Sequence, residues 1–484
     1  MGSSSRCVVA LLILFGVFSL GCADADVAVP TTVAPTTTVA PTTTVAPTTT
    51  VAPTTTLAPT TTLAPTTTVA PTTTVAPTTT LAPAPTFEAS TIFGAFSDNL
   101  QAVFTAAVAD EFNPIPEKAG INVAVFDGER LWTHAMGIAS ASAEMKPTTP
   151  VNIRSTSKTV LSALILTQVE DGLYQLTDSL ETVLAGHPDY PLVEANEYIN
   201  KSATVGHLLS QTSGMTSWLN GRPTDPTRDT LAQLDIILME NWRPALNLAK
   251  IPGPFVNPGI YEYSATNTVL LGLIAQHHGG KQVNTLYQET FFEPLGISAG
   301  LQTEVVPPPD MARPYKEREF WNGGPGFGDY WELAPFDGWT LGSRVSWVGA
   351  GIVSTPENTA RWGYELYSPN GSAISGEVRA QLIDSLQITT DIDLLGSTQY
   401  GYMITQPYIS LPDGSEINAY GHPGGEVGWN AWIYYSPALD VALSLHANAE
   451  ILHPGGRCGY RGQYVYVSVE ECIAGRIFGA LSGL

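Results

Sequence analysis

The feature that most constrains the fold of this 484-residue chain is a helix predicted over residues 159–170. Its apolar side chains fall on nearly every face, and they are Val160, Leu161, Ala163, Leu164, Ile165, Leu166 and Val169. Such a helix is stable only when other elements bury it on all sides, so a large domain must be built around it. Gly172 follows the helix and is placed for a left-handed C-cap.

Ser155-Thr156-Ser157-Lys158 opens this helix. Ser155 and Lys158 are three residues apart, so they share a face of the first turn, where unpaired N–H groups and the positive end of the helix dipole gather. A buried lysine tends to lose its proton and become a base, which makes a serine hydroxyl within its reach a nucleophile. The alternative is that Ser155 is an N-cap and Lys158 a solvated residue. The motif is short, so the rest of the chain must decide.

The composition excludes several classes of function. A net charge of -23 makes the chain a poor candidate for binding nucleic acid or anionic lipid headgroups. The sequence holds no HExxH motif and no paired-cysteine cluster, and its eight histidines are scattered. No glycine-rich phosphate loop follows a predicted strand. We therefore expect neither a metal nor a cofactor.

Residues 1–25 have the pattern of an export signal, because a short basic start precedes an apolar run too short to span a bilayer comfortably. Ala23-Asp24-Ala25 fits an A-x-A cleavage site. Leu20-Gly21-Cys22 resembles the lipobox of bacterial lipoproteins, although Ser19 stands where that motif prefers leucine. We favour a lipid anchor at Cys22, because a stalk follows it.

Residues 26–86 form a stalk rich in proline and threonine. From Val33 to Thr80 the unit Val/Leu-Ala-Pro-Thr-Thr-Thr repeats without interruption, with no charge and no aromatic residue, so this part cannot bury a core. Its prolines favour polyproline II, and the repeat could extend on the order of 150 Å. We interpret it as a spacer that holds a domain away from an envelope surface, with threonines that are candidate O-glycosylation sites.

Residues 87–484 form the globular domain. The pattern predicts helices at 98–112, 267–278 and 464–481, and hairpins at 121–136 and 429–447. Strands near both ends with helices between them predict an α+β fold. Its antiparallel sheet is built from both ends of the domain and flanked by helices, with a mostly helical insertion. The aromatic segment 318–347 is either a loop over a cleft or a satellite apolar cluster.

Three short patterns occur in a definite order: Ser155-x-x-Lys158, then Tyr263-Ser264-Ala265, then His422-Pro423-Gly424-Gly425. Together they resemble the class C β-lactamase-like serine hydrolases, a group that includes D-alanyl-D-alanine carboxypeptidases and esterases and carries Ser-x-x-Lys, Tyr-x-Asn and Lys/His-x-Gly. The resemblance covers most of residues 95–450. It includes His207–Met215, which is similar to the family stretch HLLSHTSGL.

The resemblance implies that Ser155 is the acylated nucleophile, Lys158 its basic neighbour and Tyr263 the phenolic base or acid near the leaving group. A phenol ordinarily ionises near pH 10, so Tyr263 would need a nearby cation, and Lys158 is the available one. Considered without the other patterns, Tyr263 would be a packed aromatic residue.

The same resemblance places the oxyanion hole at the backbone N–H groups of Ser155 and Gly425, the latter on the edge strand after His422-Pro423-Gly424. It also counts Gly424 among the oxyanion and substrate-binding residues. His422 would assist from this strand by hydrogen bonding or charge. Considered without the other patterns, His422 would be a satisfied turn histidine.

Two departures from the family pattern bear on the substrate. Ala265 replaces the asparagine of Tyr-x-Asn, which removes an amide expected to hold the substrate and Lys158. The stretch between Arg379 and Arg457 has no lysine or arginine to anchor a substrate carboxylate. Such a cation would have to come from elsewhere, and the candidates are Arg344, Lys316 and Arg154.

Two further patterns need a structural test. Gly296-Ile297-Ser298-Ala299-Gly300 matches the G-x-S-x-G nucleophile elbow, but an elbow needs a strand before it and a helix after it, and here the order looks reversed. Cys458 and Cys472 are the cysteines of the folded part, and in an exported protein they are expected to form a disulfide, the alternative being two buried thiols.

The sequence therefore predicts an exported, monomeric serine hydrolase that cleaves an ester or amide bond of a small molecule or peptide through an acyl-enzyme. We expect it to be esterase-like more than a true β-lactamase. The alternatives are a D-Ala-D-Ala carboxypeptidase or β-lactamase, and an envelope binding protein that keeps the fold without turnover.

Overall fold

The structure, a computed structural model, describes residues 87–111, 119–220, 239–255, 257–317, 327–329, 339, 344, 347–388, 397–426, 428–449, 452–454 and 466–483. All of them belong to one unit of the chain, Pro77–Leu484. The predicted export signal, the stalk and most of the aromatic segment 318–347 lie outside these residues.

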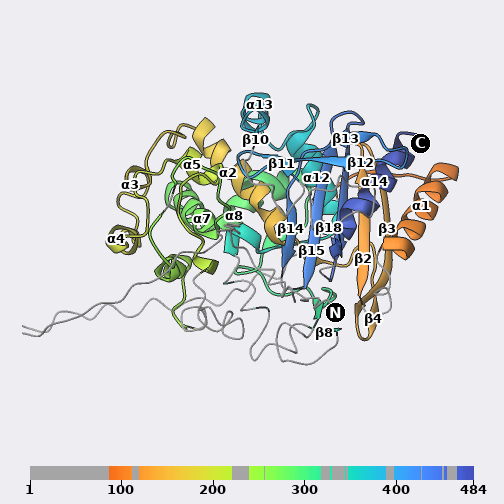
Figure 1. Cartoon of the computed structure of the whole chain (residues 1–484), viewed down its shortest axis with the longest axis horizontal. Coiled ribbons are helices and arrows are strands. Elements are labelled where there is room, and N and C mark those ends of the chain that lie inside the picture. Colours follow the sequence, from red (N-terminus) through yellow and green to blue (C-terminus); the bar gives the residue numbers. More distant parts are fainter. Residues whose placement is uncertain are drawn as a thin grey trace, which may run out of the picture. The chain divides into compact units, whose positions relative to one another are not determined.

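The central sheet joins the two ends of the domain (Figure 1). Within the described residues it has seven strands in the order β1-β3-β2-β16-β15-β14, with β4 paired to β3. β2 and β16 are antiparallel neighbours, and this pairing confirms the predicted sheet built from both ends. The strands are β1 (Ser90–Thr91), β2 (Gly120–Phe126), β3 (Arg130–Ser140), β4 (Ala143–Glu144), β14 (Pro423–Glu426), β15 (Trp429–Ser436) and β16 (Val441–Ala447).

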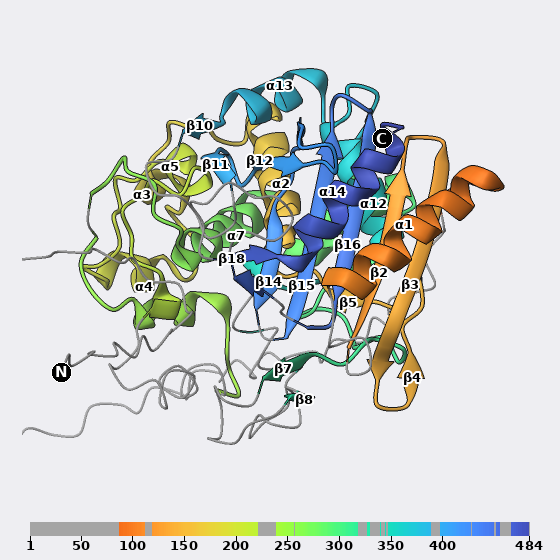
Figure 2. The ribbon, with the colours of Figure 1, turned by 45° about the vertical axis from the view of Figure 1, so that its right-hand side comes forward.

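Alternate residues of the central strands enter two different apolar cores, because successive side chains of a strand point to opposite faces. Val123 packs with α1 (Ala95–Glu111) and α14 (Val469–Leu481), which lie side by side on one face of the sheet (Figure 2). Ala124 packs into the other core, with α12 (Pro356–Tyr367) and the helical region. The sheet is therefore covered on both faces, which agrees with the predicted antiparallel sheet flanked by helices.

Two buried helices form the centre of the helical region. α2 (Lys158–Glu170) is buried on all sides, which confirms the prediction from its apolar pattern. Gly172 follows it with φ +75°. α7 (Ala265–Gly279) is also buried along most of its length and ends at Gly280, which is left-handed.

The predicted start of the last helix is wrong. Residues Tyr466–Ser468 form a strand, β18, which pairs with β17 (Leu452–Pro454), and α14 begins only at Val469. Aromatic and β-branched residues favour a strand when a partner strand is available, and that partner cannot be read from local periodicity.

The remaining described elements are short helices and the strands of three further small sheets. These sheets have the orders β10-β11-β12-β13, β5-β9-β6 and β7-β8. The helices are η1 (Arg154–Ser157), α3 (Leu180–Val183), α4 (Tyr190–Ala195), α5 (Val205–Leu209), η2 (Trp218–Asn220), η4 (Pro244–Lys250), α8 (Val283–Tyr287), η5 (Gln288–Phe292), α9 (Glu293–Leu295) and α13 (Gly376–Asp384). The strands are β5 (Val151–Asn152), β6 (Ala299–Leu301), β7 (Tyr315–Glu317), β8 (Phe327–Asp329), β9 (Ile352–Ser354), β10 (Gln387–Ile388), β11 (Ser397–Tyr400), β12 (Thr405–Ser410) and β13 (Glu416–Asn418). Among the described residues, no helix combines the length and the apolar character needed to cross a bilayer.

Candidate active site

A tight turn presents Ser155 at the start of α2. Ser155 lies in the 3-10 helix η1, which runs directly into α2, and neither helix has a side-chain N-cap bond. The interpretation of Ser155 as an N-cap is therefore wrong. Arg154, the preceding residue, has φ +50°, and its N–H donates to Asn152 Oδ1 at 2.7 Å. A non-glycine residue adopts this conformation only where its surroundings hold it, and here the result is a partly exposed hydroxyl among buried neighbours.

The Ser155 hydroxyl receives two hydrogen bonds from the side chains predicted to activate it. Lys158 Nζ and Tyr263 OH each lie 3.0 Å from Ser155 Oγ. Lys158 is buried, with 3% of its surface exposed, and its Nζ lies 4.9 Å from the centroid of the Tyr263 ring. The structure thus brings together the first two of the three sequence patterns, although 108 residues separate Ser155 from Tyr263.

Lys158 has a further acceptor that the sequence did not reveal. Its Nζ donates to the backbone carbonyl of Gly349 at 2.7 Å. A Cβ at Gly349 would lie 2.6 Å from Thr268 Oγ1, so this position requires glycine for the close approach of α7. Thr268 Oγ1 in turn donates to Ala265 O at 2.8 Å, so Gly349 lies near the position where the family motif has its asparagine. Ala265 itself donates its N–H to Ser217 Oγ at 3.2 Å.

The edge strand β14 packs directly against the serine turn. A Cβ at Gly424 would lie 2.3 Å from Ile153 O and 2.9 Å from Ser155 N, so any side chain there would push the strand away. Thr156 Oγ1 also donates to His422 O at 2.9 Å and fastens the turn to the start of the strand. Gly425 follows Gly424 in β14 and is thus one residue from this contact, on the strand that ends the sheet within the described residues.

His422 is neutral and bonded away from the serine. Its Nδ1 lies 2.6 Å from Pro423 O, so this nitrogen carries the proton and donates, and Nε2 accepts from Tyr400 OH at 3.1 Å. Burial, and to a smaller extent the charge of Lys158, lower the pKa of His422 to about 3. Of the two roles predicted for His422, charge and hydrogen bonding, only hydrogen bonding is available near neutral pH.

Two tyrosines line the site beside the predicted residues. The Tyr400 ring meets Tyr263 edge-on at a centroid distance of 6.3 Å and lies 4.9 Å from the Tyr261 ring. Sequence reasoning missed Tyr400, because it belongs to no motif and follows residues of unremarkable composition. Its place depends on the pairing of β11 with β10 and β12.

The structure describes the side chains of two of the three candidate carboxylate anchors. Arg154 is buried, with 2% exposure, and the guanidinium of Arg344 stacks on Trp242 at 5.4 Å from the ring centroid. Burial lowers the pKa of Arg344. The side chain of Lys316 lies outside the described residues.

The rival serine motif has the wrong local structure. Ser298 lies after α9 and before β6, so a helix precedes it and a strand follows, the reverse of a nucleophile elbow. Its N–H donates to Asn358 Oδ1 at 2.8 Å. No group of three or more histidine, cysteine, aspartate or glutamate side chains that could hold a metal occurs in the part of the chain that the structure describes.

The structure describes one of the two cysteines of the predicted disulfide. Cys472, on α14, is disulfide-bonded. Cys458 lies outside the described residues, so its pairing with Cys472 stays a prediction.

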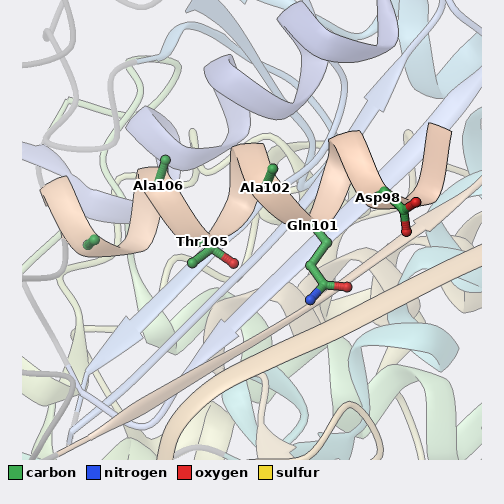
Figure 3. A pocket seen from close by; sticks show the side chains of 6 residues that line it. Asp98, Gln101, Ala102, Thr105 and Ala106 are labelled. Carbon is green, nitrogen blue, oxygen red and sulfur yellow. The ribbon is translucent and has the colours of Figure 1, made fainter. Parts of the chain in front are cut away.

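A hollow of about 440 Å³ lies on the outer face of α1, where Asp98, Gln101 and Thr105 alternate with alanines (Figure 3). α1 packs with β2 and β3, whereas Ser155 lies beside β14 at the other edge of the sheet. This hollow is therefore separate from the serine site.

The hydroxyl, amine and phenol meet in one place on an α+β fold, and this combination defines the chain as a serine hydrolase of the Ser-x-x-Lys type. A family model described as Beta-lactamase matches residues 108–461. Since this is most of the chain, the protein belongs to the β-lactamase family, which confirms the resemblance read from the three sequence patterns.

Similar proteins are also hydrolases by name. The Unguisins hydrolase ungD of Aspergillus violaceofuscus (strain CBS 115571) is 24% identical over 264 residues, which cover 52% of this chain and 43% of that protein. The chain thus spans less than half of the length of this curated relative.

Solved structures with the same fold include amidases and a penicillin-binding protein homologue. The D-amino acid amidase from Ochrobactrum anthropi SV3, complexed with D-phenylalanine, has a TM-score of 0.62 at 19% identity and covers 80% of this chain and 100% of its own. A D-stereospecific amidohydrolase from Streptomyces sp. has a TM-score of 0.58 at 17% identity. The match covers 78% of this chain and 98% of the amidohydrolase. The octameric penicillin-binding protein homologue from Pyrococcus abyssi has a TM-score of 0.53 at 20% identity, covering 73% of each chain. At these identities the likeness is one of fold.

Proposed function

We propose that the protein hydrolyses an ester or amide bond through an acyl-enzyme on Ser155, and that uncharged esters are better substrates than β-lactams. The observation that carries the proposal is the pair of 3.0 Å hydrogen bonds from Lys158 Nζ and Tyr263 OH to Ser155 Oγ. A hydroxyl in contact with an amine and a phenol can pass its proton to whichever of the two is deprotonated as it attacks a carbonyl carbon.

The reaction follows from these contacts. Either Lys158 or Tyr263 must be without its proton before attack, so that one of them accepts the proton of Ser155. Ser155 Oγ bonds to the carbonyl carbon, and the oxyanion lies at the backbone N–H groups of Ser155 and Gly425. Tyr263 then gives a proton to the leaving alcohol or amine as its bond to the acyl carbon breaks. Where Lys158 took the serine proton, Lys158 passes it on to Tyr263. Water attacks the acyl-enzyme along the same path and restores the serine.

The preference for uncharged substrates rests on the neutral strand side of the site. His422 stays unprotonated near pH 7, since its pKa is about 3, so it provides no fixed positive charge for a substrate carboxylate. Arg154 is buried and Arg344 stacks on Trp242. Tyr261 and Tyr400 instead offer an aromatic wall beside the phenol of Tyr263, which suits an apolar acyl or leaving group.

A substrate panel tests this proposal on the mature protein. Short-chain aryl esters should react at least about tenfold more efficiently than nitrocefin in kcat/KM, because Ala265 removes one polar partner from the lactamase arrangement. Ser155→Ala is the control and should be inactive throughout. Faster turnover of nitrocefin or of a D-Ala-D-Ala peptide than of any ester would favour the β-lactamase or carboxypeptidase alternative. No turnover of any substrate, with a folded protein, would favour a binding protein.

The export signal and the stalk lead us to propose that the hydrolase domain works as a monomer in the cell envelope, held by a lipid on Cys22. The lipobox-like Leu20-Gly21-Cys22 and the proline-rich spacer support this location. Mass spectrometry of the mature N-terminus in the native host distinguishes the two processing routes. A diacylglyceryl mass on Cys22 is expected. An unmodified N-terminus that begins after Ala25 would contradict the anchor.

A further inference from the structure

Gln211 has an unusual backbone and lies at the base of the Tyr263 loop. It is fully buried, with 0% of its surface exposed, and its φ of +60° is rare for a residue other than glycine. The segment that follows it runs beside the chain leading to Tyr263, and Gly259 N–H donates to Thr212 O at 2.8 Å. A buried left-handed glutamine persists only where its surroundings fix it.

Both backbone amides that flank Tyr263 donate to this one residue. The N–H of Glu262 donates to Gln211 O at 2.8 Å, and the N–H of Ser264 donates to Gln211 Oε1 at 2.9 Å. Gln211 thus presents both its backbone carbonyl and its side-chain carbonyl to residues 262–264. The loop is therefore held on either side of the residue whose phenol contacts Ser155.

A second set of hydrogen bonds fixes Gln211 against α7. Asn267 Nδ2 donates to Gln211 Oε1 at 2.7 Å, and Ser213 Oγ donates to Asn267 Oδ1 at 2.6 Å. Asn267 is buried in the first turn of α7, so the glutamine amide links that helix to the Tyr263 loop. Loss of the Gln211 amide would leave the Ser264 N–H without this acceptor inside the protein.

We infer that Gln211 is a positioning residue for the reaction, which sets the place of the Tyr263 phenol over Ser155 Oγ. The inference rests on the proposed function, because it requires Tyr263 to take part in proton transfer. Displacement of a reacting group by about 1 Å is enough to slow an enzyme on the order of a hundredfold. Gln211 itself touches neither Ser155 nor Lys158 in the described hydrogen bonds, so its effect must pass through Tyr263.

A double-mutant cycle tests the inference on the whole mature protein with an aryl ester. Gln211→Gly keeps the left-handed backbone accessible and removes only the side-chain acceptor. It should lower kcat by about ten- to a hundredfold with little change in KM. In a Tyr263→Phe background the same change should have no further effect on kcat, because the phenol is already gone. Equal losses in the two backgrounds, or no loss in the first, would overturn the inference.

Two further variants separate positioning from general stability. Asn358→Ala removes a comparable buried amide acceptor, the one that binds Ser298 N–H, and should lower Tm without changing kcat. Gln211→His places there the residue of the family stretch, which tolerates positive φ and can accept through a ring nitrogen, so it should retain most of the activity.

Each of these results bears on the inference. A loss in kcat for Asn358→Ala as large as that for Gln211→Gly would overturn it. So would a histidine variant as slow as the glycine variant. If Gln211→Gly does not fold, Gln211→Met takes its place in the cycle. A Tyr263→Phe enzyme as fast as the wild type would instead contradict the proposed function, and this outcome is visible before Gln211 is changed.

Discussion

Two regions of the central sheet bury ionisable side chains, and only one of them forms a reactive site. At the β14 edge, Lys158 and His422 are buried beside Ser155, and the pKa of His422 is lowered to about 3. The second region, which we call the sheet interior, consists of β16 and the first turn of α14, the helix packed on it. There, burial lowers the pKa of His446 to about 3 and raises that of Glu471 to about 8. The shifts in the two regions are of similar size.

The difference lies in what the buried groups contact. His446 Nε2 lies 3.0 Å from the hydroxyl of Ser444, which is fully buried, whereas Lys158 contacts a hydroxyl that is partly exposed. A perturbed pKa marks burial in both regions, but chemistry also needs a reacting atom that substrate can reach. The partners of Lys158, and not its burial, therefore identify the active site.

The largest expected effect is a loss of activity, which should follow a substitution at the β14 edge but not one in the sheet interior. Lys158→Ala should lower kcat by about a thousandfold or more, because the group that contacts Ser155 Oγ is lost, while the fold is kept. His446→Gln is the matched control, since it also removes a buried basic side chain and should leave kcat near the wild-type value. Steady-state kinetics together with circular dichroism measure both. A Lys158→Ala enzyme within about tenfold of wild type would show that the two regions do not differ in this way.

The second-largest effect is a change in stability with pH, and it should appear only in the sheet interior. Glu471 is held protonated up to about pH 8 by burial, whereas in the unfolded chain it ionises near 4.5. The unfolded state therefore loses its proton first, and stability falls as pH rises from about 4.5 to 8. Glu471→Gln should remove this pH-dependent loss. The substitution should therefore stabilise the protein by roughly 3 kcal/mol more at pH 7 than at pH 4. Denaturant titrations at the two pH values measure it, and an equal effect at both would contradict the assigned shift.

His422 and His446 allow the stability of the two regions to be compared directly at acidic pH. Both stay neutral in the folded protein down to about pH 3, whereas the unfolded chain binds a proton below about 6.5, so each makes stability fall as pH drops below 6.5. Replacement of either one by glutamine should reduce the loss between pH 6.5 and 5 by about 2 kcal/mol. Only His422→Gln should also lower kcat/KM. Equal kinetic effects of the two variants would remove the distinction between the regions.

The smallest effect concerns selectivity within the site. Ala265→Asn restores the amide of the family motif at a residue linked through Thr268 to Gly349, whose carbonyl accepts from Lys158. It should narrow the preference for aryl esters over nitrocefin, by about tenfold or less, since one buried hydrogen bond is worth on the order of 1 kcal/mol. The ratio of the two kcat/KM values measures this. An unchanged or wider ratio would show that Ala265 does not limit β-lactam turnover.

Sequence patterns predicted the parts of the molecule that local chemistry determines. The apolar pattern over residues 159–170 predicted the buried helix, and the two hairpins predicted the antiparallel sheet. The order of three motifs predicted that Ser155, Lys158 and Tyr263 would meet. These features depend on side chains whose type and spacing are visible in the chain.

The rest depends on contacts between segments far apart in sequence. Gly349 acts through its backbone carbonyl, which any residue has, and its closeness to Thr268 cannot be read from spacing. Tyr400 has no motif around it. Gln211 lies in a stretch that the resemblance covers, but its left-handed backbone and its bonds on both sides of Tyr263 appear only in the folded chain.

The most direct test of the account is covalent labelling of the serine. A fluorophosphonate probe should react with the mature protein, and peptide mass spectrometry should place the adduct on Ser155. Ser155→Ala should abolish the labelling, and Lys158→Ala should slow it. Labelling that survives Ser155→Ala, or that maps to Ser298, would contradict the claim that Lys158 and Tyr263 activate Ser155.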